Sequence, residues 1–266
     1  MQGLLDQKVA IITGAGSGVG RAAALLFARH GAKVVASDVN SARLEETVAQ
    51  VRSEGGEARA VPCDVSDEKA VQRLVDAAVS AYGRLDIIYN NAGLTAPPAP
   101  GKRMKLFMDT TAEETASMEA VNVHGVINGC KAAIGQFERQ GGGGIIVNTA
   151  SVAGLVGFGS VVYGATKGAI TTLTRALAIE VAPAGIRINS VCPGGMPTYF
   201  AGMDPNGPNA EAARKSMSAL HPLGRPIEPM DAANAALFLC SDLASNITGV
   251  NLPVDGGLAA GVTRRG

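Results

Sequence analysis

Two side chains four residues apart could carry proton transfer. The stretch "YGATK" places Tyr163 and Lys167 at positions i and i+4, which share one face if the apolar run that follows is a helix. A free phenol has a pKa near 10, so it exchanges protons at neutral pH only when a nearby cation favours the phenolate. The pair is therefore a candidate acid/base with Lys167 lowering the pKa of Tyr163. Simple packing on a half-buried helix is the alternative.

A hydroxyl near this pair would complete the chemistry. Ser151 follows the strand-like run "GIIVNTAS", and its hydroxyl can hold a substrate oxygen and stabilise charge that develops there. A local turn bond is the simpler role for Ser151. Thr149 is a competing hydroxyl, because the alternation along the run is too irregular to choose between the two.

The elements that must position these residues form a regular alternation. Six apolar strands, from "KVAIITG" to "IRINSVCPGG", are separated by amphipathic helices, and "GVNLPVDGG" adds a last strand. Parallel strands need crossovers and are covered on both faces. We therefore expect an α/β fold, with a Rossmann-like doubly wound parallel sheet of about seven strands and helices on both faces, in a single domain over residues 1–266.

The loops after the strands should bind a dinucleotide, since ligands of such folds lie outside the carboxyl ends of the strands. "TGAGSGVG" follows the first strand and opens the first helix. Its glycines allow a tight turn, and a helix N-terminus offers free N–H groups to a pyrophosphate. The common G-x-G-x-x-G pattern does not fit from Gly14, because position 19 is Val, so the placement between strand and helix carries the prediction.

Asp38 ends the second strand and predicts the type of cofactor. It lies 18 residues after Gly20, near the distance of roughly 20 at which an acid binds the adenosine ribose. A carboxylate there accepts from both hydroxyls of NAD and repels the 2'-phosphate of NADP. Ser17 and Val39 supply no cation to offset that repulsion. Asp38 could instead cap the next helix, but Ser41 can do so without it. We expect NAD.

Composition excludes several other classes of function. The chain has 23 Lys plus Arg and 23 Asp plus Glu with no block of like charge, so we expect neither nucleic acid nor a membrane as partner. No apolar run has transmembrane length and the N-terminus does not resemble a signal peptide, which indicates a cytoplasmic protein. The four cysteines are scattered, and we expect them to be reduced and to bind no metal.

Several loops together resemble the short-chain dehydrogenase/reductase family. The shared set spans nearly the whole chain in order: "TGAGSGVG", Asp38, "CDV", "NNAG", Asn122 in "VNVHG", Ser151, "YGATK", "CPGGMPT" and "TGVNLPVDGG". The resemblance implies an NAD(P)-dependent oxidoreductase that acts on an alcohol or ketone and is usually a homotetramer.

The resemblance also implies roles for single residues. Asn122, Ser151, Tyr163 and Lys167 would be catalytic, with Asn122 bending its helix and holding a water that relays protons to Lys167. Lys167 would also bind the nicotinamide ribose, and Thr198 the nicotinamide carboxamide or the pyrophosphate. The crevice loops and the resemblance together predict these cofactor-binding residues: Gly14, Ser17, Gly18, Val19, Gly20, Asp38, Val39, Asp64, Val65, Asn91, Ala92, Gly93, Tyr163, Lys167, Pro193, Gly194, Met196 and Thr198.

Two segments outside the shared motifs bear on the substrate. Residues 195–220 are the expected lid, with Tyr199, Phe200 and Met203 as apolar contacts. The loop over residues 94–117 is longer than in typical relatives and offers an apolar run at 106–108. The segment between Ser151 and Tyr163 is one residue shorter than in many relatives. The two apolar segments suggest an apolar, cyclic substrate.

Three functions therefore compete. The main hypothesis is an NAD-dependent oxidoreductase that interconverts a secondary alcohol and a ketone. An NADPH-dependent ketoreductase of the 3-oxoacyl-carrier-protein type is the second, and Asp38 argues against it. A dinucleotide-sensing module without catalysis is the third, and the intact Asn122, Ser151, Tyr163 and Lys167 argue against it, because a sensor needs no proton donor.

Overall fold

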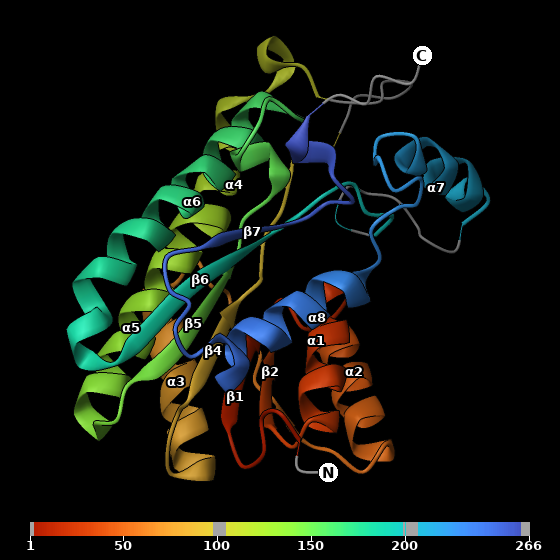
Figure 1. The fold of residues 1–266 in the computed structure, drawn as a ribbon. Coiled ribbons are helices and arrows are strands. Elements are labelled where there is room, and N and C mark those ends of the chain that lie inside the picture. The colour runs from red at the N-terminus through yellow and green to blue at the C-terminus, as the bar shows by residue number, and fades with distance from the viewer. Residues whose placement is uncertain (1–2, 98–104, 199, 201–206, 262–266) are drawn as a thin grey trace.

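The computed structural model describes residues 3–97, 105–198, 200 and 207–261. Its centre is a sheet of seven parallel strands in the order β3-β2-β1-β4-β5-β6-β7 (Figure 1). The predicted doubly wound parallel sheet is confirmed. The strands are β1 (Val9–Thr13), β2 (Lys33–Ser37), β3 (Glu57–Ala60), β4 (Ile87–Asn90), β5 (Gly144–Thr149), β6 (Ile186–Pro193) and β7 (Asn251–Val254).

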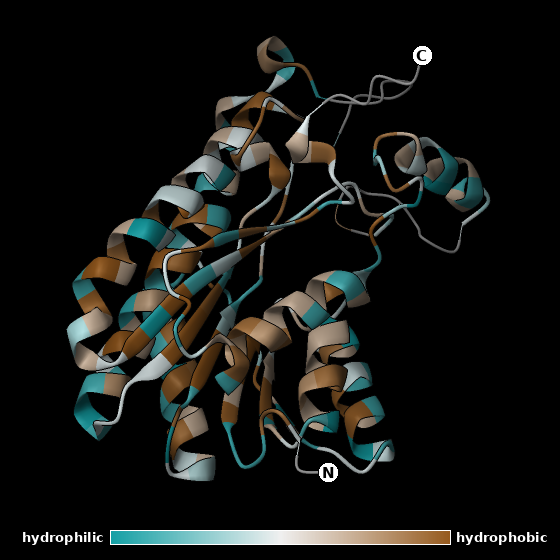
Figure 2. Ribbon diagram, in the orientation of Figure 1, coloured by the Kyte–Doolittle hydropathy of each residue, from teal (hydrophilic) through white to brown (hydrophobic). Residues whose placement is uncertain are grey.

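Helices cover both faces of this sheet. Alternate side chains of β1 serve the two faces: Ala10 and Ile12 pack in one apolar cluster, and Val9 and Ile11 in the other. β1 and β2 are accordingly mostly hydrophobic in Figure 2. On the first face lie α1 (Gly18–Arg29), α2 (Ser41–Ser53) and α8 (Pro229–Cys240), and on the second α3 (Glu68–Tyr82), α5 (Gly125–Gln140) and α6 (Val161–Val181).

Two further helices lie beside the carboxyl edge of the sheet. α4 (Ala112–Glu119) runs into α5 through a π-helical turn over Ala120–His124. α7 (Ala210–Ser218) stands apart from the sheet and falls within the expected lid (Figure 1). None of the helices in the described ranges is long and apolar enough to cross a membrane.

Local signals set the ends of the helices. Gly31, Gly55, Gly83 and Gly185 have φ between +71° and +88° after the helical runs, a left-handed conformation that favours glycine at helix ends. The N-terminus of α2 differs from the expectation that Ser41 caps it. Asn40 is the cap, since its side chain accepts a hydrogen bond from the Arg43 N–H at 3.0 Å.

The strand order reverses between β1 and β4, and the crevice expected there is built by close backbone packing. Thr13 at the end of β1 accepts hydrogen bonds from the N–H groups of Asn91 and Ala92 at 3.0 and 3.1 Å. A Cβ atom on Gly14 would lie 2.9 Å from the Ala92 Cα. The loops after β1 and β4 therefore form one surface at the point where such folds bind ligands.

The face of α5 that packs on β4 generates a stability prediction. A Cβ atom on Gly129 would collide with Oδ1 of Asn90, whose amide is held by Asn148 at 3.0 Å. We expect Gly129→Ala to lower the free energy of unfolding by about 1–3 kcal/mol, the usual cost of overpacking. Gly135→Ala in the same helix meets no atom closer than 3.5 Å, and we expect a gain of about 0.5–1 kcal/mol. Urea denaturation measures both, and equal effects would contradict the prediction.

Candidate active site

The predicted acid/base pair lies on the first half of α6. Lys167 is only 2% exposed, and its Nζ donates a hydrogen bond to the Thr149 carbonyl at 2.7 Å. The same Nζ lies 5.7 Å from the centroid of the half-buried Tyr163 ring. The structure therefore brings Tyr163 and Lys167 to one face at the carboxyl end of β5, as their spacing predicts.

Burial controls the protonation of both groups. It raises the pKa of Tyr163 to about 12, although a hydrogen bond with the Ser151 side chain lowers it in part. Burial lowers the pKa of Lys167 to about 8, because the ammonium loses its hydration. The expected lowering of the Tyr163 pKa is not found in the protein alone, because burial desolvates the phenolate. The Lys167 ammonium donates to the Thr149 carbonyl.

Ser151, rather than Thr149, is the hydroxyl beside Tyr163. The Thr149 hydroxyl donates to the Tyr89 hydroxyl at 3.0 Å and lies 3.2 Å from Oδ1 of Asn91. Ser151 accepts from the Ala153 N–H at 3.2 Å, which is the local turn bond considered above, and its side chain also contacts Tyr163. The turn bond therefore orients Ser151 toward the acid/base pair instead of excluding it.

Asn122 occupies the π-helical turn between α4 and α5 and is fully buried. Its amide donates to the Leu94 carbonyl at 2.8 Å and to the Thr166 hydroxyl at 3.1 Å, and accepts from the Leu94 N–H at 2.8 Å. The wider turn departs from the α-helix at the place where a bend is expected. Asn122 thus ties the loop after β4 to α6, one residue from Lys167.

The loop after β1 has the features needed to hold a pyrophosphate. α1 begins at Gly18, and the side chain of its N-cap Ser17 makes no capping hydrogen bond, so N–H groups of the first turn keep their capacity to bind an anion. Gly14 and Gly18 have φ of +65° and +52°. A Cβ atom on Gly20 would collide with the Gly14 carbonyl. Only glycine fits this cradle, so the residues present fit the phosphates of a dinucleotide.

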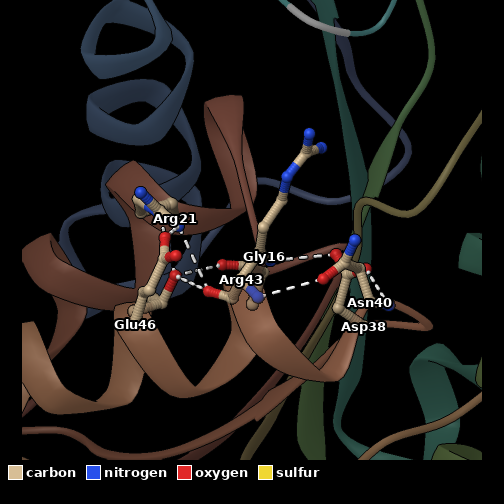
Figure 3. Close-up of polar contacts among 8 residues, drawn as sticks. Gly16, Arg21, Asp38, Asn40, Arg43 and Glu46 are labelled. Atoms are coloured by element: carbon tan, nitrogen blue, oxygen red, sulfur yellow. Dashed lines mark hydrogen bonds and ion pairs between the residues drawn. The ribbon is translucent and has the colours of Figure 1, made fainter.

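Asp38 projects from the end of β2 beside that cradle (Figure 3). Its Oδ2 accepts from the Gly16 N–H at 2.9 Å and its Oδ1 from the Asn40 N–H at 2.8 Å. These bonds fix the orientation of the carboxylate while the residue remains partly exposed. Val39 beside it is 70% exposed. The arrangement fits an acid that receives hydroxyl groups of a ribose.

Arg43 is a residue near the ribose position that sequence reasoning missed. It belongs to the first turn of α2 and lies beside Gly16 and Asp38 (Figure 3). A Cβ atom on Gly16 would lie 3.2 Å from the Cβ of Arg43. The sequence carries a signal for Arg43, because a helix that begins so soon after Asp38 places its first turn next to the loop after β1.

The other predicted cofactor residues lie along the carboxyl edge of the sheet, where some are exposed and others are buried. The exposed Asp64 carboxylate accepts from the N–H and hydroxyl of Ser66 at 2.9 and 2.7 Å, so it stabilises its own turn. Val65 is buried and packs against the Gly125 position.

Thr198 contacts the position of a Cβ on Gly18 at 3.8 Å, which places the loop after β6 across the cradle. Pro193 ends β6, and Gly194 and Met196 follow it in the same loop. Gly93 lies beside Asn122 and Lys167.

Phe200, a residue of the expected lid, lies near the acid/base pair. Its ring meets the Tyr163 ring edge-on, with 5.6 Å between the ring centroids. The other two predicted lid contacts, Tyr199 and Met203, lie outside the described residues. The apolar run at 106–108 is exposed in and beside a short 3-10 helix over Phe107–Asp109.

The doubly wound sheet, the phosphate cradle and the Ser–Tyr–Lys arrangement define a class, the dinucleotide-binding oxidoreductases. A family model described as enoyl-(acyl carrier protein) reductase matches residues 14–259. The chain belongs to the short-chain dehydrogenase/reductase family, as its motifs predict. It is therefore an oxidoreductase.

Named relatives and solved structures agree with this assignment. The chain is 39% identical over 264 residues to 2,5-dichloro-2,5-cyclohexadiene-1,4-diol dehydrogenase LinX of Sphingobium indicum, covering 98% of this chain and 100% of the relative. It is 37% identical to cyclopentanol dehydrogenase of a Comamonas species, with coverages of 97% and 99%. The crystal structure of levodione reductase matches with a TM-score of 0.87 at 35% identity, over 97% of this chain and 100% of that one.

The buried Lys167 generates a prediction on the pH dependence of stability. Its pKa falls from 10.5 to about 8 on folding, so between these values the unfolded chain binds more protons at this site and stability rises with pH. Lys167→Met removes this contribution. We therefore expect the free energy of unfolding of the wild type, minus that of Lys167→Met, to increase between about pH 8 and about pH 10.5.

Urea denaturation across that pH range measures the difference in free energy of unfolding between wild type and Lys167→Met. The titration of other groups is common to both proteins and cancels in this difference. Lys131→Met, at an exposed position on α5, controls for the loss of one positive charge. A difference between wild type and Lys167→Met that stays constant with pH would show that Lys167 is not desolvated as described.

Proposed function

We propose that this chain is an NAD-dependent dehydrogenase that interconverts a secondary alcohol and a ketone by hydride transfer. One observation carries the proposal: Tyr163, Lys167, Ser151 and Asn122 converge at the carboxyl edge of the sheet, next to a glycine cradle that fits a dinucleotide. The named relatives act on alcohols, and this supports CH–OH groups as the reacting centre.

The residues of this site divide the work on the substrate hydroxyl. Bound NAD would accept the hydride from the carbinol carbon, held by the loops after β1, β4 and β6. Tyr163 takes the hydroxyl proton, or returns it in the reverse direction. Ser151 donates a hydrogen bond to the same oxygen and stabilises charge that develops on it. Lys167 holds α6 in place through its hydrogen bond to Thr149. Asn122 holds the loop after β4 in place through its hydrogen bond with Leu94.

The acid/base step needs a lower Tyr163 pKa than the protein alone provides, and a bound oxidised cofactor would supply positive charge near this site. Burial holds the Tyr163 pKa at about 12. The oxidised nicotinamide carries a formal positive charge, which favours the phenolate when it lies close by. The oxidation of an alcohol should therefore accelerate at alkaline pH, where the phenolate is easier to form.

An apolar and cyclic substrate is supported by the lid and by two relatives. Phe200 packs edge-on against the Tyr163 ring and adds an aromatic surface next to the proposed acid/base. The relatives named above act on a cyclohexadiene diol and on cyclopentanol. We propose that the substrate is a small ring bearing a secondary hydroxyl group.

A ketoreductase acting on acyl-carrier-protein substrates is the second candidate. A 3-ketoacyl-(acyl-carrier-protein) reductase from Brucella melitensis, in complex with NADH, matches with a TM-score of 0.84 at 38% identity, over 96% of this chain and 99% of that one. The NADPH dependence assigned to this candidate conflicts with Asp38. A non-catalytic sensor has less support, because it would not need the buried Lys167 beside Tyr163.

We also propose that the chain is one domain, forms a homotetramer and acts in the cytoplasm. The family resemblance supports the tetramer, and the continuous seven-stranded sheet supports one domain. Light scattering on the purified chain measures the subunit number directly.

The assignment of the acid/base predicts the effect of one oxygen atom. Tyr163→Phe should lower kcat by about 10²- to 10⁴-fold, because general acid/base catalysis is lost, while the Kd for NAD changes little. Initial rates on cyclic secondary alcohols and titration with NAD measure the two effects. Tyr82→Phe, at the far end of α3, is the matched control and should retain full turnover. Retained turnover in Tyr163→Phe would contradict the assignment.

The choice of cofactor is tested at Asp38 and Arg43. Asp38→Ala should raise the Kd for NAD by roughly tenfold to a hundredfold, the value of hydrogen bonds to a charged group, and improve binding of NADP relative to NAD. Arg43→Ala should weaken NADP more than NAD, since a guanidinium beside this position favours a 2'-phosphate. Side-by-side titrations of both variants decide the matter. An unchanged ratio of the two Kd values in Asp38→Ala would refute the proposed selectivity for NAD.

A further inference from the structure

The loop after β6 is held by three other segments through two glycines. The Gly194 N–H donates to the Val254 carbonyl at 3.0 Å. The Gly195 carbonyl accepts from the Ile227 N–H at 3.3 Å, and the Gly195 N–H donates to Nε2 of His221 at 3.1 Å. Thr198, three residues further along, contacts the Gly18 position of the phosphate cradle. The bonds at Gly195 therefore help to set where the loop crosses the cofactor site.

His221 lies between this loop and the turn after β7, shortly after α7. It is 3% exposed. A Cβ atom on Gly194 would lie 2.6 Å from Nε2 of His221, and one on Gly256 would lie 3.0 Å from the Cβ of His221. The imidazole thus fills a space that two glycines leave open. Three segments, from β6, α7 and β7, meet on this one side chain.

The hydrogen bond from Gly195 fixes the tautomer of His221. Because Nε2 accepts, the proton of the neutral ring must sit on Nδ1. Nδ1 is buried and has no hydrogen-bond partner among the described residues. An unsatisfied buried donor destabilises the folded chain. Packing alone therefore does not account for an imidazole at this position. The contact that stabilises it is the hydrogen bond that Nε2 accepts.

We infer that His221 is a positioning residue, which holds the nicotinamide side of the cofactor site in place through Gly195; this rests on the proposed function. The Gly194, Gly195 and Gly256 positions lie against His221 and bring no charge to it. Asp255 lies beside the Gly194 position, and its carboxylate accepts from the N–H groups of Gly257 and Ala259 at 3.0 and 2.7 Å.

Two amide variants of different reach test this role. In His221→Gln the side-chain oxygen can reach the place of Nε2, whereas in His221→Asn it reaches only the place of Nδ1. At about pH 8 we expect His221→Gln to bind NAD within about twofold of the wild type, and His221→Asn to bind about fivefold to tenfold more weakly, as for one lost hydrogen bond. The kcat at saturating NAD should change less than the Kd.

Rescue by glutamine but not by asparagine supplies the readout that packing alone would not change. Equal NAD affinities in wild type, His221→Gln and His221→Asn would overturn the inference.

Hydrogen exchange at the Gly195 amide separates this inference from the proposed function, because it needs no cofactor. Exchange should be slow in the wild type and in His221→Gln, and faster in His221→Asn. If the wild type bound no NAD, the proposed function would fail, while the exchange rates would still test the contact. Thermal unfolding identifies the conditions under which His221→Asn is folded, and exchange is compared only there. Equal exchange in all three proteins under these conditions would overturn the inference.

Discussion

Lys167 places an ammonium group in the interior of the protein, next to the carboxyl end of β5. A buried cation is costly unless it is hydrogen-bonded, and Nζ of Lys167 meets the Thr149 carbonyl at 2.7 Å. The surroundings leave room for this side chain and its helix. A Cβ atom on Gly154 would lie 2.6 Å from the Lys167 carbonyl, and one on Gly93 would lie 3.5 Å from Nζ. The site depends on this contact, because it fixes α6, and hence Tyr163, against the sheet.

A continuous hydrogen-bonded path joins this contact to the phosphate cradle. The Thr149 hydroxyl reaches Tyr89 and Asn91, and the Asn91 amide donates to the carbonyls of Thr13 and Gly14 at 3.0 and 3.4 Å. Tyr89 is fully buried, so its hydroxyl needs such a partner. The loops proposed to hold the cofactor and the helix that carries the proposed acid/base are thereby set relative to each other by hydrogen bonds.

Much of this architecture could be predicted because its causes are local. The alternation of apolar strands and amphipathic helices predicts the parallel sheet, and the glycines predict helix ends and the cradle. The i and i+4 spacing predicts that Tyr163 and Lys167 share a face. The role of Asn122 is implied by the family resemblance, and the structure supplies Leu94 and Thr166 as its partners. The cap of α2 was wrongly predicted by one residue, since Ser41 and Asn40 are both able to cap.

The sequence by itself determined the order of the elements, the loops at the carboxyl edge and the types of residue that do chemistry there, because periodicity, turn residues and short spacings are properties of neighbours along the chain. Only the tertiary structure decided between Thr149 and Ser151, placed Arg43 beside Asp38 and His221 beneath Gly195, and showed that burial raises the pKa of Tyr163. Each of these depends on partners far apart in the chain and on the loss of water around a group, which no local pattern records.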